Sequence, residues 1–272
     1  MAFWIFLSRD VSLVTLSIFT AVALTVIGAL RWSGKVHPHR VALFARRQEL
    51  AVTPATEPIV HDYLRITRMV RSAGLVAGLA FTTLGFNSYL FLASTPLDAF
   101  TGWFLGVIGA ELVLARRHGS GPGATTDRLP ALLSPPASWF LYAGVTLGGM
   151  ILLLGAVDLA LGGPRPGQLW LGFGGLVPVC ALLLVRSLRR RPIPVASAEV
   201  VAAVLATRSR STHVLATGGA VFALDILWPD SFPPPSGSLP ADLLLSAAAI
   251  AALIVGTHPW AITVTAPAPT PP

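Results

Sequence analysis

Two long apolar runs that follow one another closely restrict the fold of this chain more than any other feature. Residues 73–92 and 99–115 are each about long enough to cross the roughly 30 Å of hydrocarbon in a bilayer, at about 1.5 Å of helix per residue. A short acidic turn separates the two runs, and Arg116 and Arg117 close the second one. The pattern predicts a helical hairpin in a membrane.

Further apolar runs extend this prediction to the whole chain. With 54% hydrophobic and 11% charged residues, the composition excludes an ordinary soluble globule. We expect an all-α, polytopic transmembrane helix bundle in residues 1–258, a single domain made of one lone helix and three hairpins, followed by a disordered tail in residues 259–272. The seven predicted spans are residues 11–30, 73–92, 99–115, 138–160, 169–185, 213–228 and 241–257.

The basic residues predict how the spans are oriented. Of the nineteen lysine and arginine residues, all except Arg9 and Arg165 fall on the same predicted side of the membrane. In membrane proteins the cytoplasmic loops carry the excess of basic residues. We therefore expect the N-terminus outside and the C-terminus in the cytoplasm.

Two basic, amphipathic segments lie on the predicted cytoplasmic side. Residues 59–74 are expected to continue into the following apolar run as one helix, whereas residues 196–211 are expected to form a separate surface helix with Ser197 as its N-cap. Anionic lipids of the inner leaflet attract arginine side chains on such segments. The predicted partners are therefore the lipid bilayer with its anionic inner-leaflet lipids and, in addition, another membrane protein.

Glycine residues recur on single faces of the predicted helices. Because successive residues of a helix turn by about 100°, their spacing places them in stripes. Such stripes allow membrane helices to pack closely. A shift of about 70 residues superposes two of the stripes, which fits either a parallel repeat or the general abundance of glycine in the chain. The predicted packing residues are Gly74, Gly78, Gly85, Gly102, Gly106, Gly109, Gly144, Gly148 and Gly155.

Polar side chains inside the predicted spans are the candidates for function, because an ionised group at mid-membrane costs roughly 2.5 to 3.5 kcal/mol and is seldom left facing lipid. Glu111 lies in the inner half of the third span, Asn87 is the only asparagine, and Asp225 lies in the outer third of the sixth span. We expect these three residues to line a transport path. The structural alternatives are a hydrogen bond from Asn87 to a neighbouring helix, solvation of Asp225, and an ion pair or a protonated carboxyl at Glu111.

Motifs for catalysis, metal binding or nucleotide binding are absent or incomplete. His37, His39 and His61 lack both a fixed helical spacing and a nearby cysteine, and Cys180 is the single cysteine. The glycine-rich stretch 119–126 lacks the lysine that contacts phosphates in a nucleotide-binding loop. We therefore expect no enzyme activity, no metal, no cofactor and no nucleic-acid partner.

Residue usage adds a resemblance. The chain contains eighteen arginines but one lysine, and the stretch RPIPVASAEVVAAVLATRSRSTHVLA is similar in style to uncharacterised multi-pass membrane proteins of high-GC actinobacteria. This resemblance implies a plasma (inner) membrane location and assigns no functional residue. Our functional hypothesis is a component of small-solute or ion transport. The alternative is a non-catalytic accessory or scaffold subunit that docks onto a membrane complex through its basic amphipathic helices.

Overall fold

The computed structural model of this chain describes residues 36–83, 98–118, 123–124, 132–162, 168–194, 196–231 and 239–258. Within these ranges the chain is all-α, with seven helices and one antiparallel contact between two-residue strands. Four of the predictions fall outside the described residues, namely those for the span at 11–30, Gly85, Asn87 and the tail at 259–272.

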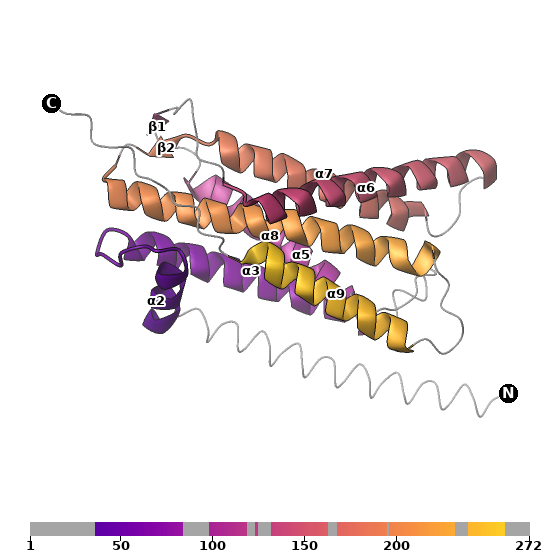
Figure 1. Ribbon diagram of the computed structural model, residues 1–272, viewed down its shortest axis with the longest axis horizontal. Helices are drawn as coiled ribbons and strands as arrows, with labels where there is room; N and C mark the ends of the chain where they lie inside the picture. The colour runs from indigo at the N-terminus through magenta and orange to yellow at the C-terminus, as the bar shows by residue number, and fades with distance from the viewer. Residues whose placement is uncertain are drawn as a thin grey trace.

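The long helices lie beside one another in an elongated bundle (Figure 1). The helices are α2 (Pro38–Arg47), α3 (Glu57–Thr83), α5 (Asp98–His118), α6 (Pro135–Gly162), α7 (Gln168–Arg190), α8 (Ala198–Ser231) and α9 (Leu239–Thr257). The strands β1 (Gly123–Ala124) and β2 (Ile193–Pro194) pair antiparallel. This pairing holds the segment after α5 against the segment after α7.

Helix α8 forms the centre of the bundle and packs against α3, α5, α6, α7 and α9 (Figure 1). Its residues 211–223 are buried without interruption, so every face of this part of the helix meets another element. An amphipathic surface helix would bury only one stripe. Alanine, glycine and threonine are frequent in this stretch, and their small side chains allow neighbouring helices to approach from all directions.

Residues 196–211 do not form the separate surface helix that their basic residues suggested. They lead into α8, which begins at Ala198 and continues without a break for 34 residues. Leu205 and Ser209 are buried, because neighbouring elements cover this end of α8 as well. By contrast, the unbroken helix α3 confirms the prediction that residues 59–74 continue into the following apolar run.

Glycines bring α3 and α5 into direct backbone contact. A Cβ atom at Gly102 would lie 2.5 Å from the Cα atom of Gly78 and 2.6 Å from its backbone nitrogen. A Cβ atom at Gly74 would lie 2.8 Å from the Cα atom of Gly106. Gly109 is less crowded, since a Cβ atom there would lie 3.4 Å from Cγ1 of Val70. The close approach of α3 and α5 therefore depends on the missing Cβ atoms on both helices.

The second hairpin uses its glycines differently. Gly148 and Gly155 pack on the hairpin partner α7, but Gly144 packs against the backbone of α8. Gly172, which a shift of about 70 residues aligns with Gly102, has no neighbour within 4 Å in the described part of the chain. The aligned pairs Gly74 with Gly144 and Gly102 with Gly172 therefore make different contacts in the two hairpins.

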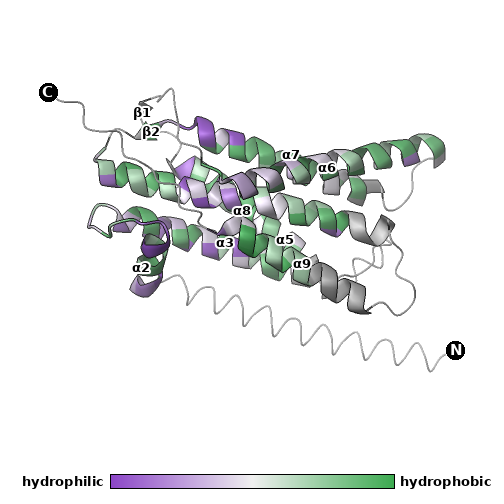
Figure 2. Cartoon of the chain, in the orientation of Figure 1, coloured by the Kyte–Doolittle hydropathy of each residue, from purple (hydrophilic) through white to green (hydrophobic). Residues whose placement is uncertain are grey.

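Two of the described helices are long and apolar enough to cross a membrane: α6 over Pro135–Gly162 and α7 over Leu171–Arg190. Length and composition thus support association with a membrane, while seven spans are not confirmed in the described residues. Hydropathy also differs along the bundle. Hydrophilic residues gather on α2, on the first half of α3 and on the last turns of α7, and α6 is largely hydrophobic (Figure 2).

Candidate functional site

A run of seven consecutive polar residues interrupts the apolar sequence of α8. These are residues 207–213 (TRSRSTH), and together with their partners Glu111, Tyr63 and Ser134 we refer to them as the polar hub. A helix turns by about 100° per residue, so seven consecutive side chains point in every direction around α8. The hub therefore connects several neighbouring elements at once.

Glu111 of α5 is the acidic member of the hub and is only 1% exposed. Its Oε1 atom accepts a hydrogen bond from Ser211 Oγ at 2.6 Å, and Ser211 Oγ lies 3.3 Å from the hydroxyl of Tyr63 in α3. A serine hydroxyl has one proton, so when Ser211 donates to Glu111 the Tyr63 phenol is the donor in the second bond. Burial raises the pKa of Tyr63, which keeps the phenol protonated at neutral pH. This chain of hydrogen bonds joins α3, α5 and α8.

Arg71 of α3 supplies positive charge beside this chain. It interacts electrostatically with Glu111 and Tyr63, and its Cζ atom lies 6.0 Å from the centroid of the Trp103 ring, a cation–π arrangement. Its Nε and Nη2 atoms are buried and have no hydrogen-bond partner among the described residues. Glu111 and Arg71 thus attract each other without a direct hydrogen bond. The Nε and Nη2 atoms of Arg71 can donate hydrogen bonds to a further group.

The two arginines of the hub each bind the C-terminal end of a neighbouring helix. Arg208 donates from Nη1 to the carbonyl oxygen of Arg191 at 2.7 Å and from Nη2 to that of Pro192 at 2.8 Å, just beyond α7. Arg210 donates to the carbonyl oxygen of Thr257, the last residue of α9. The final carbonyl groups of a helix carry partial negative charge and lack partners within the helix, so both contacts stabilise the bundle.

His213 joins α8 to the segment in front of α6. Its Nδ1 atom lies 2.7 Å from the carbonyl oxygen of Ser209, which can only accept, so Nδ1 carries a proton. In the neutral ring Nε2 accepts from the backbone N–H and the hydroxyl of Ser134, at 3.2 and 3.0 Å. The hydroxyl groups of Ser209 and Thr212 donate to the carbonyl oxygen of Leu132 in the same segment. A backbone carbonyl group, and not a carboxylate, orients the imidazole, and the pair of His213 and Ser134 links α8 to the segment in front of α6.

Asp225, the second predicted acid, occupies another part of the α5–α8 interface. Its Oδ2 atom accepts a hydrogen bond from Thr101 Oγ1 at 3.0 Å, and the residue is 4% exposed. Thr101 and Glu111 are separated by about 15 Å along α5. The Phe104 ring lies in the buried core between them, with its centroid 5.9 Å from that of Phe222. The structure thus places both acids on one interface, in two polar clusters divided by an aromatic layer.

Other predicted residues do not join these clusters. His37 and His39 are exposed at the start of α2. Within the described ranges, no group of three or more His, Cys, Asp or Glu side chains is placed to hold a metal ion. The hub itself offers hydroxyl groups, one carboxylate, one imidazole and the guanidinium groups of Arg208 and Arg210.

Sequence reasoning identified Glu111 but missed the residues around it. Arg71 and Tyr63 were assigned to a basic amphipathic segment, and His213 marked only the start of a predicted span. The run TRSRSTH shows where polar groups gather on the chain. It does not predict a buried hub, because water would satisfy the same hydroxyl groups on a surface helix.

Comparison with known proteins adds no functional assignment. The chain matches no protein-family model, no curated protein and no solved structure. Function is therefore argued from the chemistry of the site itself.

Proposed function

We propose that this protein is a multi-pass membrane protein whose interior carries a transport site for a small solute or ion. The outer surface of α6 supports the membrane location. In the apolar window of this helix 22% of the residues are buried, and side chains as large as Trp139, Leu153 and Leu161 are exposed. Removing such a side chain from water is favourable by about 1.5 to 3 kcal/mol. The exposed side chains of α6 gain this free energy when they contact lipid tails.

We further infer seven spans in the plasma membrane, with the N-terminus outside and the C-terminus in the cytoplasm. The support is the distribution of basic side chains over the bundle. Arg65 near the start of α3, Arg117 at the end of α5 and Arg190 at the end of α7 belong to segments that lie at the same end of the bundle (Figure 1). Such an end is expected to face the cytoplasm.

Cysteine labelling tests this orientation. In a Cys180→Ala background, single cysteines at Pro96 and Ser236 are expected to react with an impermeant thiol reagent added to intact cells. Single cysteines at Gly123 and Ser197 are expected to react only in inverted membrane vesicles, because the predicted cytoplasmic side faces outward there. The opposite pattern, read by mass shift of the labelled protein, would reverse the proposed orientation.

The transport part of the proposal is carried by the environment of Glu111. The buried carboxylate meets the hydroxyl group of Ser211, and Arg71 nearby has two buried donors without partners in the described residues. Ionisable groups inside membrane bundles mark paths for ions, protons and solutes. In this arrangement the carboxylate can hold a cation or a proton, and the free donors of Arg71 can hold an anionic group of the transported species.

Phe104 supplies a barrier in this proposal. Its ring packs directly on Gly218 of α8, between the cluster around Glu111 and the pair of Thr101 and Asp225. A path that uses both acids has to pass this ring. We therefore propose that displacement of Phe104 opens the connection between the two clusters, and that its return to Gly218 closes it.

Water access to the hub tests the transport proposal without knowledge of the solute. With Cys180 replaced by alanine, the variant Ser211→Cys is expected to react with a small cationic methanethiosulfonate reagent from the cytoplasmic side. The matched variant Ala216→Cys is expected to stay unlabelled, because Ala216 belongs to the apolar core although both residues are 1% exposed. Equal protection of both cysteines in the folded protein would contradict a water path.

A second candidate function is a non-catalytic accessory or scaffold subunit of a membrane complex, and α2 favours it. One face of α2 packs on the bundle through Val41 and Phe44, while Arg40, Arg46 and Arg47 are exposed on the other. An exposed basic face of this kind suits an acidic partner surface. Co-purification of a stoichiometric partner from native membranes, lost on Arg40→Gln together with Arg46→Gln, would support this function over transport.

A further inference from the structure

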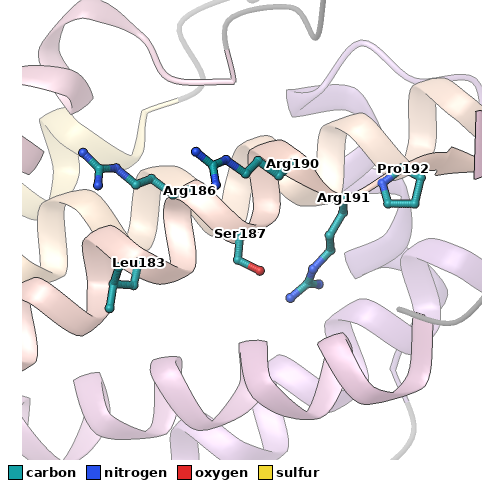
Figure 3. A pocket seen from close by; sticks show the side chains of 6 residues that line it. All are labelled: Leu183, Arg186, Ser187, Arg190, Arg191 and Pro192. Atoms are coloured by element: carbon teal, nitrogen blue, oxygen red, sulfur yellow. The ribbon is translucent and has the colours of Figure 1, made fainter. Parts of the chain in front are cut away.

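A basic hollow opens on the surface at the C-terminal end of α7. It has a volume of about 510 Å³ and is lined by Leu183, Arg186, Ser187, Arg190, Arg191 and Pro192. Figure 3 shows Arg186 and Arg190 on one side of α7, and Leu183, Ser187 and Arg191 on the other. Three guanidinium groups and one hydroxyl group thus border the hollow, together with an apolar side chain at its edge.

No ion pair among the described residues neutralises the positive charge of this hollow. In the described part of the chain one salt bridge is found, and it joins Arg117 to Asp62. Arg186 and Arg190 are exposed, whereas Arg191 is half-buried and also feels the charge of Glu111 from the hub. The two exposed arginines therefore direct positive potential outward.

A further guanidinium group lies beside the C-terminal end of α7, where the helix dipole alone is negative. The carbonyl groups at a helix C-terminus carry partial negative charge. Here Arg208 donates to the carbonyl oxygens of Arg191 and Pro192, at 2.7 and 2.8 Å, and so covers them. Burial, and after it the charge of Arg191, lowers the pKa of Arg208, as expected where like charges lie close together. Arg208 thus places a fourth guanidinium group against the backbone of two residues that line the hollow.

The exposed face of α7 changes from apolar to basic at this point. Leu176 and Leu183 are each 56% exposed and lie one heptad apart, on the same face of the helix. Arg190 follows one further heptad along α7 and is also exposed, and its side chain extends away from that of Leu183 in Figure 3. A molecule with an apolar tail and an anionic head would match this change, whereas a free anion would use only the basic half.

We infer that the hollow binds the phosphate group of an anionic phospholipid, with an acyl chain along Leu176 and Leu183. Arginine side chains present two parallel donors to phosphate oxygens, and Ser187 adds a hydroxyl donor. The inference depends on the membrane location proposed above but not on the transport role. The lipid would fix the end of α7, to which Arg208 of the hub is bound.

Lipid binding to the full-length protein in maltoside micelles tests this site. Titration with dioleoyl phosphatidylglycerol, followed by native mass spectrometry, is expected to give saturable binding that dioleoyl phosphatidylcholine does not reproduce. Replacement of both Arg186 and Arg190 by glutamine is expected to weaken the binding about 30-fold. Each basic residue near an anionic headgroup contributes about fivefold to the affinity. The matched double variant Arg46→Gln, Arg47→Gln has the same charge change on α2 and is expected to bind within about twofold of the parent protein.

Three outcomes would overturn the assignment. Equal losses in the two double variants would mean that net charge alone attracts the lipid. Displacement of the lipid by millimolar inorganic phosphate would identify a free-anion site instead, and equal binding of the zwitterionic lipid would exclude a role for headgroup charge. Resistance of the protein to carbonate extraction reports the membrane location separately and is expected to be unchanged in the Arg186 and Arg190 variant. Unfolding temperature without lipid checks that this variant is folded.

Discussion

A single methyl group at Gly102 is expected to lower the free energy of unfolding by about 3 kcal/mol, the upper part of the usual range for overpacking. The new Cβ atom would lie 2.5 Å from the Cα atom of Gly78 and 2.6 Å from its nitrogen, and neither backbone atom can rotate away. Helices α3 and α5 would have to separate. This cost exceeds the gain of about 1 kcal/mol that alanine normally brings to a helix. Denaturant unfolding of the Gly102→Ala protein in micelles measures the change.

Gly149 in α6 provides the control for this prediction. Among the described residues, no atom outside the neighbouring part of α6 lies within 4 Å of a Cβ atom built at Gly149, and the residue is exposed. Gly149→Ala is therefore expected to leave stability unchanged or raise it by up to about 1 kcal/mol. If the two alanine variants lost similar amounts of unfolding free energy, the close contact of α3 with α5 would not explain the loss at Gly102.

Replacing Glu111 with leucine is expected to cost about 3 kcal/mol of unfolding free energy and to abolish transport. The substitution leaves the hydroxyl group of Ser211, to which Tyr63 donates, without its acceptor and leaves Arg71 without the nearby opposite charge. Glu111→Gln keeps the shape and an oxygen that accepts from Ser211, so its expected cost is about 1 kcal/mol. Transport is expected to be lost in both variants, because both remove the ionisable group.

Proton flux and unfolding, measured on the same preparations, separate these effects. Flux is followed with a pH-sensitive dye trapped in vesicles that contain the purified protein, after a membrane potential is imposed. Asp62→Asn is the matched control, because Asp62 forms a surface ion pair with Arg117 at 3.5 Å that contributes about 0 to 1 kcal/mol. If Glu111→Leu were as stable and as active as Asp62→Asn, Glu111 would be neither a transport site nor a structural member of the hub.

Local properties of the chain could be predicted from the sequence. The spacing of apolar residues through 59–74 continues into the next apolar run without a helix breaker, and α3 is one helix as that pattern indicates. Glu111 could be singled out because a carboxyl group in an apolar run is costly wherever the helix lies. Neither inference required knowledge of a neighbouring helix.

The partners of these residues were decided by the tertiary structure. Ser211 and Glu111 are 100 residues apart in the chain, and His213 and Ser134 are 79 residues apart. Residues 207–213 have the composition of a solvated basic surface, and only the packing of other elements around α8 turns them into a buried hub.

The glycines illustrate the same division. Helical spacing predicts that they form stripes, because that spacing is a property of one helix. It does not determine what faces each stripe: Gly102 meets the backbone of Gly78, whereas Gly172 meets nothing within 4 Å in the described residues. The sequence by itself therefore determined the all-α class and where small and polar residues lie along the helices. The tertiary structure decided which faces meet, because contact energies depend on residues that are distant in the chain.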